Sequence, residues 1–283
     1  MLSNPGSASA ATSDLSGAGD AAMLERFEAL ALAAGAEIMD VYDAGITVED
    51  KADSSPVTEA DRRAEIVILQ GLRESFPGIP CVAEEEVSSG LLPPDLGRAF
   101  FLVDPLDGTK EFIKRRPDFT VNIALVRDGV PVVGIVYAPA QRMLYGGRSG
   151  LAWSATVSED HRVTSRSAMM VRACPPSRTI VASRSHRTPE TDAFIDRHAG
   201  CDIVSVGSSL KFCLLASGQA DLYPRFGRTM EWDTAAGDAV LRAAGGSVRL
   251  VDGGDFLYGK RNQGHDADFA NPWFIAQGAP PAA

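Results

Sequence analysis

Apolar side chains recur at helical spacing in two early segments of the chain. In residues 23–42 they return every three or four positions, and the Ala-rich filler between them favours a helix. A second helix is predicted over residues 58–75, where Pro77-Gly78 follows and ends it. Its expected apolar stripe consists of Ile66, Leu69, Leu72 and Phe76.

Short apolar runs bounded by turn residues follow these helices. They are rich in Val, Ile and Phe and have the length of strands. They span residues 79–83, 99–103, 120–127 and 132–137. Asp128-Gly129, between the last two runs, has the composition of a hairpin turn. Because the strands follow one another without βαβ alternation, the first half is predicted to be α+β.

After Ser158 the predicted strands and helices alternate along the chain. Strands are predicted at residues 179–182, 201–206 and 220–224, and helices at residues 189–198, 209–217 and 233–244. Gly245-Gly246 ends the last helix. We therefore expect an N-terminal α+β half over residues 23–158 and a C-terminal α/β half over residues 159–283. Residues 1–22, rich in Ser, Ala and Gly, are expected to form a disordered tail.

Composition narrows the classes of function. The chain has 283 residues, of which 45% are hydrophobic and 23% charged, as in ordinary globular proteins. Its net charge of −10 argues against binding to a nucleic-acid polymer or an anionic membrane surface. The four cysteines form no C-x-x-C pair, and no apolar run approaches the length of a membrane span. A cytoplasmic protein with reduced thiols is the expectation.

The sharpest local signal is the sequence Asp-Pro-Leu-Asp-Gly-Thr at residues 104–109, directly after an apolar strand. Carboxylates at the exit of a buried strand lie where functional loops are held by a rigid scaffold. Asp104, Asp107 and the carbonyl of Leu106 could then converge on one hard cation. Gly108 permits a backbone conformation that a larger residue would resist. The alternative is a tight surface turn, for which Asp, Pro and Gly are the usual residues.

Other carboxylates have the same double interpretation. Three glutamates at residues 84–86 follow an apolar run, as a metal-binding or a solvated acidic loop would. Asp233 stands at the start of a predicted helix, where Asp is a preferred cap. Asp61 lies three residues after Thr58, in the pattern of a capping box, and taken alone it is best explained as a cap.

At these residues the sequence resembles the inositol monophosphatase superfamily, and within it the bacterial 3'(2'),5'-bisphosphate nucleotidases. The hexapeptide at residues 104–109 is similar to the first signature of the family, and Trp-Asp-Thr-Ala-Ala-Gly at residues 232–237 to the second. Further similar segments lie at residues 51–58, 110–114, 207–213 and 223–227. The resemblance implies a layered αβαβα sandwich of the inositol monophosphatase and sugar phosphatase type.

The resemblance also implies roles for single residues. The implied Mg²⁺ ligands, for two or three ions, are Glu84, Asp104, Asp107, Asp233 and the carbonyl of Leu106. Asp61 and Thr109, with Glu84, would orient or activate the attacking water, and Glu85 would support the ligands from behind. The implied substrate contacts are Gly108, Thr109, His186, Ser208, Ser209, Lys211, Arg225 and Asp233. Backbone N–H groups at residues 107–109, where a helix is expected to begin, would meet the phosphate.

The implied activity is hydrolysis of the 3'-phosphate of adenosine 3',5'-bisphosphate, or of its sulfated precursor, by a metal-activated water. An inositol or sugar phosphatase is the first alternative, and a non-catalytic metabolite-binding protein is the second. Inhibition by Li⁺ is implied as well, while the oligomeric state is left open, with a homodimer as one alternative. For Ser208 and Ser209 ordinary helix capping is the simpler interpretation, and for Lys211 and Arg225 a solvated face.

Two features depart from the expected pattern, and one motif points elsewhere. Glu231 stands where an apolar or neutral residue is expected, and it could alter the charge near the substrate. Residues 264–268 are unlike the usual approach to the last strand of the family. The S-x-x-K pattern from Ser208 to Lys211 occurs in acyl-transfer enzymes, but the accompanying K-T-G and S-D-N are absent.

Overall fold

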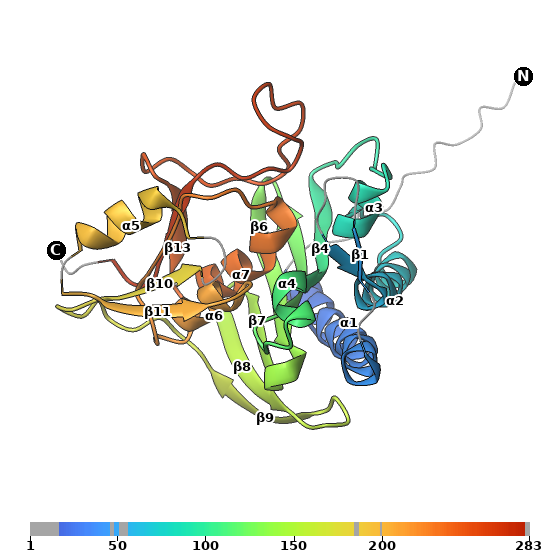
Figure 1. The fold of residues 1–283 in the computed structure, drawn as a ribbon. Helices are drawn as coiled ribbons and strands as arrows, with labels where there is room; N and C mark the ends of the chain where they lie inside the picture. The colour runs from blue at the N-terminus through green and yellow to red at the C-terminus, as the bar shows by residue number, and fades with distance from the viewer. Residues whose placement is uncertain (1–16, 46–47, 51–55, 184–186, 199, 281–283) are drawn as a thin grey trace, which may run out of the picture.

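Two β-sheets with helices between and outside them make up the structure, a computed structural model (Figure 1). It describes residues 17–45, 48–50, 56–183, 187–198 and 200–280. The larger sheet has seven strands in the order β3-β4-β5-β6-β7-β8-β9, and the smaller has five in the order β11-β10-β12-β14-β13. A short ladder pairs β1 (Val48–Asp50) with β2 (Pro56–Thr58).

The larger sheet is a meander apart from its first strand, β3, which runs parallel to β4. Its strands are β3 (Cys81–Ala83), β4 (Ala99–Asp107), β5 (Thr120–Arg127), β6 (Val130–Ala138), β7 (Met143–Arg148), β8 (Leu151–Val157) and β9 (Val163–Ala168). The turn at Asp128-Gly129 joins β5 to β6, as predicted. Side chains alternate between the two faces of the sheet. On β4, Phe101 and Val103 face one hydrophobic core, while Phe100 and Leu102 face the other.

The smaller sheet is mixed. Its strands are β10 (Thr179–Ser183), β11 (Asp202–Val206), β12 (Leu222–Arg225), β13 (Ser247–Leu250) and β14 (Phe274–Gln277). β10 pairs in parallel with β11 and β12, whereas β14 pairs antiparallel with β12 and β13. The parallel part is the alternating α/β segment that the sequence predicts.

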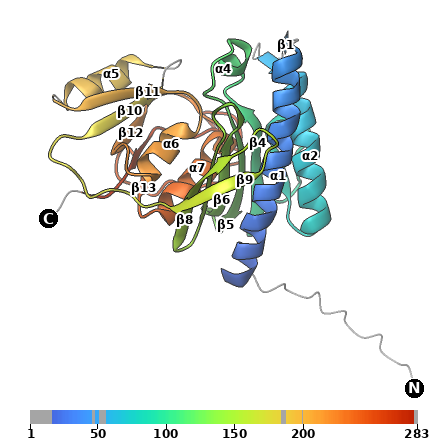
Figure 2. The ribbon, with the colours of Figure 1, turned by 90° about the horizontal axis from the view of Figure 1, so that it is seen from below.

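Helices occupy three layers, so the order across the molecule is αβαβα (Figures 1 and 2). The longer helices are α1 (Gly17–Ala44), α2 (Glu59–Ser75), α5 (Pro189–Asp196), α6 (Leu210–Ala216) and α7 (Glu231–Ala243). The short ones are α3 (Glu84–Ser88), α4 (Thr109–Ile113) and a 3₁₀ turn at Pro139–Gln141. α1 and α2 cover the outer face of the larger sheet, α6 and α7 lie between the sheets, and α5 covers the smaller one. The predicted layered fold is confirmed.

Several expectations about single elements need correction. Ile66 is 65% exposed, because the buried face of α2 passes through Ala64, Ile68 and Leu72 instead. The strands β7, β8 and β9 were not predicted. Because β9 pairs with β8, the larger sheet continues beyond Ser158, where we expected the two halves to divide. The first helix begins at Gly17, inside the expected tail, and the rest of that tail lies outside the described residues.

Within the described residues, none of the helices combines the length and the apolar character that a membrane crossing requires.

Candidate functional site

A cleft of about 650 Å³ opens where the loops after β3 and β4 meet the starts of α6 and α7. Its lining contains both acidic and basic side chains. Its acidic lining consists of Glu84, Asp104, Asp107, Glu111 and Asp233, and its basic lining of Lys110, Lys211, Arg225 and Arg228. A single cleft therefore contains both the carboxylates and the cations that the sequence singled out.

The loop at residues 104–109 is shaped by its own backbone. The β4–β5 register shifts between Asp104 and Asp107, and Oδ1 of Asp104 accepts a hydrogen bond from the Leu106 N–H at 3.0 Å. Gly108 has φ +95°, a left-handed conformation that side chains disfavour, and α4 begins at the next residue. A Cβ atom on Gly108 would also lie 3.0 Å from the carbonyl oxygen of Asp118. Gly108 therefore has the kind of backbone conformation that the sequence predicts, one that a larger residue would resist.

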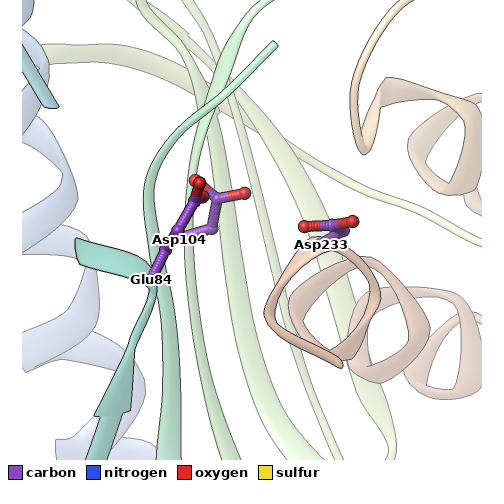
Figure 3. A group of neighbouring side chains, drawn as sticks. All are labelled: Glu84, Asp104 and Asp233. Carbon is purple, nitrogen blue, oxygen red and sulfur yellow. The ribbon is translucent and has the colours of Figure 1, made fainter. Parts of the chain in front are cut away.

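Glu84, Asp104 and Asp233 come together from three separate elements (Figure 3). One carboxylate oxygen from each lies within 4.8 Å of the other two. Parallel pairing of β3 with β4 ends at Ala83 and Val103, so the next residue of each strand is a member of this group. Asp233 faces the pair from the first turn of α7. Residues distant in sequence thus present three hard oxygen ligands to one point.

Electrostatics favour a cation at this point. Burial raises the pKa of Asp104 well above its usual value, and the charges of Glu84, Asp107 and Asp233 raise it further. Burial, together with Asp107 and Glu84, likewise raises the pKa of Asp233. Carboxylates held this close repel one another unless a cation or a proton compensates. Oxygen donors of this kind fit Mg²⁺, which binds carboxylates and retains several waters.

Asp107 lies next to the three carboxylates, but its hydrogen bonds point to α6. Its Oδ2 accepts hydrogen bonds from the hydroxyls of Ser208 at 2.7 Å and Ser209 at 3.1 Å. Ser209 precedes α6 without capping it through its side chain, so the capping interpretation of this serine is wrong. The hydroxyl of Ser208 also lies against that of Thr120. Both serines therefore hold Asp107, and Ser208 also lines the cleft.

Asp61 and Thr109 meet beside this group. Oδ2 of Asp61 accepts hydrogen bonds from the backbone N–H and the hydroxyl of Thr58, at 2.8 and 2.6 Å, which completes the predicted capping box. Oδ1 of Asp61 accepts a hydrogen bond from the Thr109 hydroxyl at 3.3 Å. The same hydroxyl lies 3.3 Å from the carbonyl oxygen of Leu106. Asp61 therefore caps α2 with one oxygen and contacts the cleft-lining threonine with the other.

The structure distinguishes the three consecutive glutamates. Glu84 belongs to the carboxylate group, whereas Glu86 pairs with Arg73 of α2 at 2.7 Å. The backbone N–H of Glu85 donates to the carboxylate of Glu65 at 2.9 Å. Asp233 has a second contact besides its place in the carboxylate group. Its Oδ2 accepts a hydrogen bond from the Met230 N–H at 2.8 Å.

Basic residues from α6 and β12 line the same cleft as the carboxylates. Lys211 and Arg225 are 5% and 8% exposed, which excludes the alternative of a solvated face for both. Burial lowers the pKa of Lys211 to about 8, while the Asp107 charge acts in the opposite direction. The Arg225 guanidinium donates to the carbonyl oxygens of Gly227 and Arg228, at 3.2 and 2.9 Å. His186, the other predicted contact, lies outside the described residues.

Sequence reasoning missed several residues of this region, among them Glu65, Glu111 and Arg228, and it misjudged Glu231. Glu65 is buried on the same face of α2 as Asp61, a spacing of four that could have indicated it. Glu111 and Arg228 line the cleft, and Arg228 pairs with Asp266 of the unusual loop at 3.3 Å. Glu231 is fully buried and pairs with Lys260 at 2.7 Å, and it is not among the residues that line the cleft.

Comparisons with known proteins agree with this geometry. The model of the inositol monophosphatase family matches residues 21–277. The 3'(2'),5'-bisphosphate nucleotidase CysQ of Salmonella typhimurium is 45% identical over 254 residues, which are 89% of this chain and 98% of that protein. The same enzyme of Escherichia coli K12 is 44% identical with the same coverage.

Solved structures give the same result. The crystal structure of CysQ from Bacteroides thetaiotaomicron superimposes with a TM-score of 0.72 and 38% identity, over 91% of this chain and 97% of that one. An IMPase from Thermotoga maritima has a TM-score of 0.71 at 25% identity, over 90% of this chain and 92% of the other.

Proposed function

This chain belongs to the inositol monophosphatase family, and we propose that it is a metal-dependent 3'(2'),5'-bisphosphate nucleotidase. Its substrate would be adenosine 3',5'-bisphosphate or the sulfated precursor, with AMP and phosphate as products in the first case. The observation that carries the proposal is one cleft in which Glu84, Asp104 and Asp233 converge and which Lys211 and Arg225 also line. Relatives more than 40% identical over most of the chain carry this enzyme name.

Glu84, Asp104, Asp107, Asp233 and the carbonyl of Leu106 would hold Mg²⁺, as two or three ions. When bound, Mg²⁺ supplies a nucleophile by lowering the pKa of water and stabilises the charge on the leaving oxygen. The donor set fits this role because its members are buried or half-buried oxygen atoms, and the repulsion among the carboxylates is offset by a bound cation.

Thr109 and Asp61 would orient the attacking water and move its proton. The Thr109 hydroxyl donates toward Asp61, so its oxygen lone pairs are directed to the other side, where a water could donate to it. The capping bonds from Thr58 fix the Asp61 carboxylate in place, so the pair is preorganised. Backbone N–H groups at Gly108 and Thr109 would bind the phosphate at the start of α4.

Lys211 and Arg225 would bind the phosphate that is not cleaved. Both are buried cationic side chains in a chain of net charge −10, and a second phosphate would pair with them. Ser208 and Ser209, with the predicted contact His186, would complete this part of the pocket. An inositol monophosphate has no second phosphate for these cations, and this difference favours the nucleotide.

The test compares phosphate release from adenosine 3',5'-bisphosphate, inositol 1-phosphate and fructose 1,6-bisphosphate at equal concentrations, with Mg²⁺ and with EDTA. We expect Mg²⁺-dependent release with at least a tenfold preference for the nucleotide, which corresponds to about 1.4 kcal/mol in transition-state binding. A preference for inositol phosphate would refute the role of Lys211 and Arg225. Absence of release from all three would instead favour a binding protein.

Sensitivity to Li⁺, a cytoplasmic location and a homodimer remain predictions from the sequence.

A further inference from the structure

The helix turn that carries Glu84 lacks a cap of its own. α3 begins at Glu84, and the preceding residue, Ala83, makes no side-chain hydrogen bond to the helix start. The first N–H groups of a helix have no partner within the helix and need an acceptor from elsewhere. The β3–β4 ladder ends at Ala83 and therefore does not hold the residues beyond it.

Glu65 of α2 supplies the missing acceptor. Its side chain is buried, with 6% exposure, and its Oε2 accepts the Glu85 N–H at 2.9 Å. A carboxylate from another helix thus caps the first turn of α3, where the Glu84 side chain departs towards Asp104 and Asp233.

The position of Glu65 on α2 relates it to a second part of the site. Asp61 and Glu65 are four residues apart, so their side chains lie on one face of the helix, one turn from each other. Asp61 contacts Thr109 of the loop after β4, and Glu65 contacts the turn after β3. One rigid helix therefore holds both loops that bring acidic ligands to the cleft.

Stability alone does not account for a carboxylate here. Burial is the main cause that raises the pKa of Glu65 to about 7, and the neighbouring charges of Glu85 and Glu86 add to it, against the opposing effect of the hydrogen bond from the Glu85 N–H. A buried ionisable group in such surroundings costs free energy that an apolar residue of similar size would not. Residues of this kind are expected where function requires them.

We propose that Glu65 is a positioning residue of the metal centre, which caps α3 and so directs the Glu84 carboxylate towards Asp104 and Asp233. The inference rests on the proposed function, because it presumes that these three side chains bind Mg²⁺. Glu65 itself acts through Glu84, so its loss weakens metal binding and leaves the chemistry of the bound complex intact.

The experiment measures Mg²⁺ binding directly, by calorimetric titration without substrate and by the shift of the thermal unfolding midpoint with Mg²⁺. Glu65→Leu removes both acceptor oxygens, and Glu65→Gln retains one. Glu74→Gln, at an exposed position of the same helix, is the matched control. We expect about tenfold weaker Mg²⁺ binding for Glu65→Leu, a smaller loss for Glu65→Gln, and wild-type binding for the control.

In steady-state assays the Mg²⁺ concentration for half-maximal rate should rise by the same factors, with kcat restored at saturating Mg²⁺. Unfolding midpoints in EDTA should not fall in the Gln variant. Wild-type Mg²⁺ affinity in folded Glu65→Leu or Glu65→Gln, or a lower kcat at saturating Mg²⁺, would overturn the inference. If the wild-type protein bound no Mg²⁺, that result would refute the proposed metal centre and therefore the role of Glu65 as well.

Discussion

Removal of one charge from the carboxylate group should stabilise the metal-free protein while it abolishes metal binding. In Asp104→Asn the amide oxygen can still accept the Leu106 N–H that Oδ1 accepts at 3.0 Å. The side chain keeps its volume, so packing around this buried position should change little. What disappears is the repulsion between Asp104 and the carboxylates of Glu84 and Asp233.

The size of this repulsion follows from the distances. Oxygens at most 4.8 Å apart carry like charges that repel by about 3 kcal/mol per pair at an effective dielectric constant of about 20. Proton uptake by the metal-free group relieves part of that repulsion. We therefore expect Asp104→Asn to exceed the wild type by about 2 kcal/mol at pH 8 in EDTA, or about 4–8 °C in unfolding midpoint.

The assay is thermal unfolding of both proteins in EDTA and in excess Mg²⁺. Mg²⁺ should raise the wild-type midpoint above that of the variant, because only the intact group binds it tightly, and the order of stability should reverse. Asp128→Asn is the control, since Asp128 pairs with Arg98 on the surface and follows the end of the β4–β5 ladder that lies away from Asp104 and Asp107. A variant less stable than the wild type in EDTA, or an equal response of both to Mg²⁺, would refute the reasoning.

The stability difference between Asp104→Asn and the wild type in EDTA should depend on pH. The pKa values of Asp104 and Asp233 are raised in the folded protein, so the folded state binds protons more tightly than the unfolded chain. The stability gained this way is complete below the ordinary carboxyl pKa of 3.8 and is lost as pH rises through the raised folded values. In EDTA the advantage of Asp104→Asn should therefore grow with pH, and a constant difference from pH 5 to pH 8 would contradict this.

Three further substitutions test other parts of the site. Thr109→Val, which removes the hydroxyl that contacts Asp61, should lower kcat by about 100-fold with little change in Mg²⁺ binding, as measured by steady-state kinetics and titration. Lys211→Met should reduce kcat/KM for the nucleotide bisphosphate by about 10–100-fold and leave inositol 1-phosphate hydrolysis nearly unchanged. An equal loss of kcat/KM on both substrates would exclude a role of Lys211 in binding the second phosphate. Gly108→Ala should lower the free energy of unfolding by about 1–2 kcal/mol in denaturant titrations, because φ is +95° and the added Cβ would crowd the Asp118 carbonyl.

Much of the site could be predicted because its parts are local in sequence. The capping box of Thr58 and Asp61 spans four residues, and the loop from Asp104 to Thr109 follows its own strand directly. The geometry of the capping box and of this loop depends on the conformation of the neighbouring backbone, and the residue types at these positions determine that conformation. The hairpin at Asp128-Gly129 was predictable for the same reason.

Strands β7 to β9 escaped prediction because tertiary contacts determine their composition. β7 contains two consecutive glycines, which weaken any strand signal. A Cβ atom on Gly147 would lie 2.6 Å from the Cα of Val240, so glycine is required there by the approach of α7. The residue that requires glycine at position 147, Val240, is nearly a hundred positions further along the chain.

By itself, the sequence determined the two N-terminal helices, the strands up to residue 137 and the α/β alternation from residue 179 to residue 244. It also determined the candidate ligands at Asp104, Asp107 and Asp233, and the family resemblance. Only the tertiary structure decided that Glu84, and not Glu86, joins the carboxylate group, because Arg73 of α2 pairs with Glu86. It also decided that Glu231 pairs with Lys260 and that Glu65 caps α3. Each of these outcomes depends on which side chain, distant in sequence, comes within hydrogen-bonding distance. The pattern of residues along a short segment does not predict such contacts.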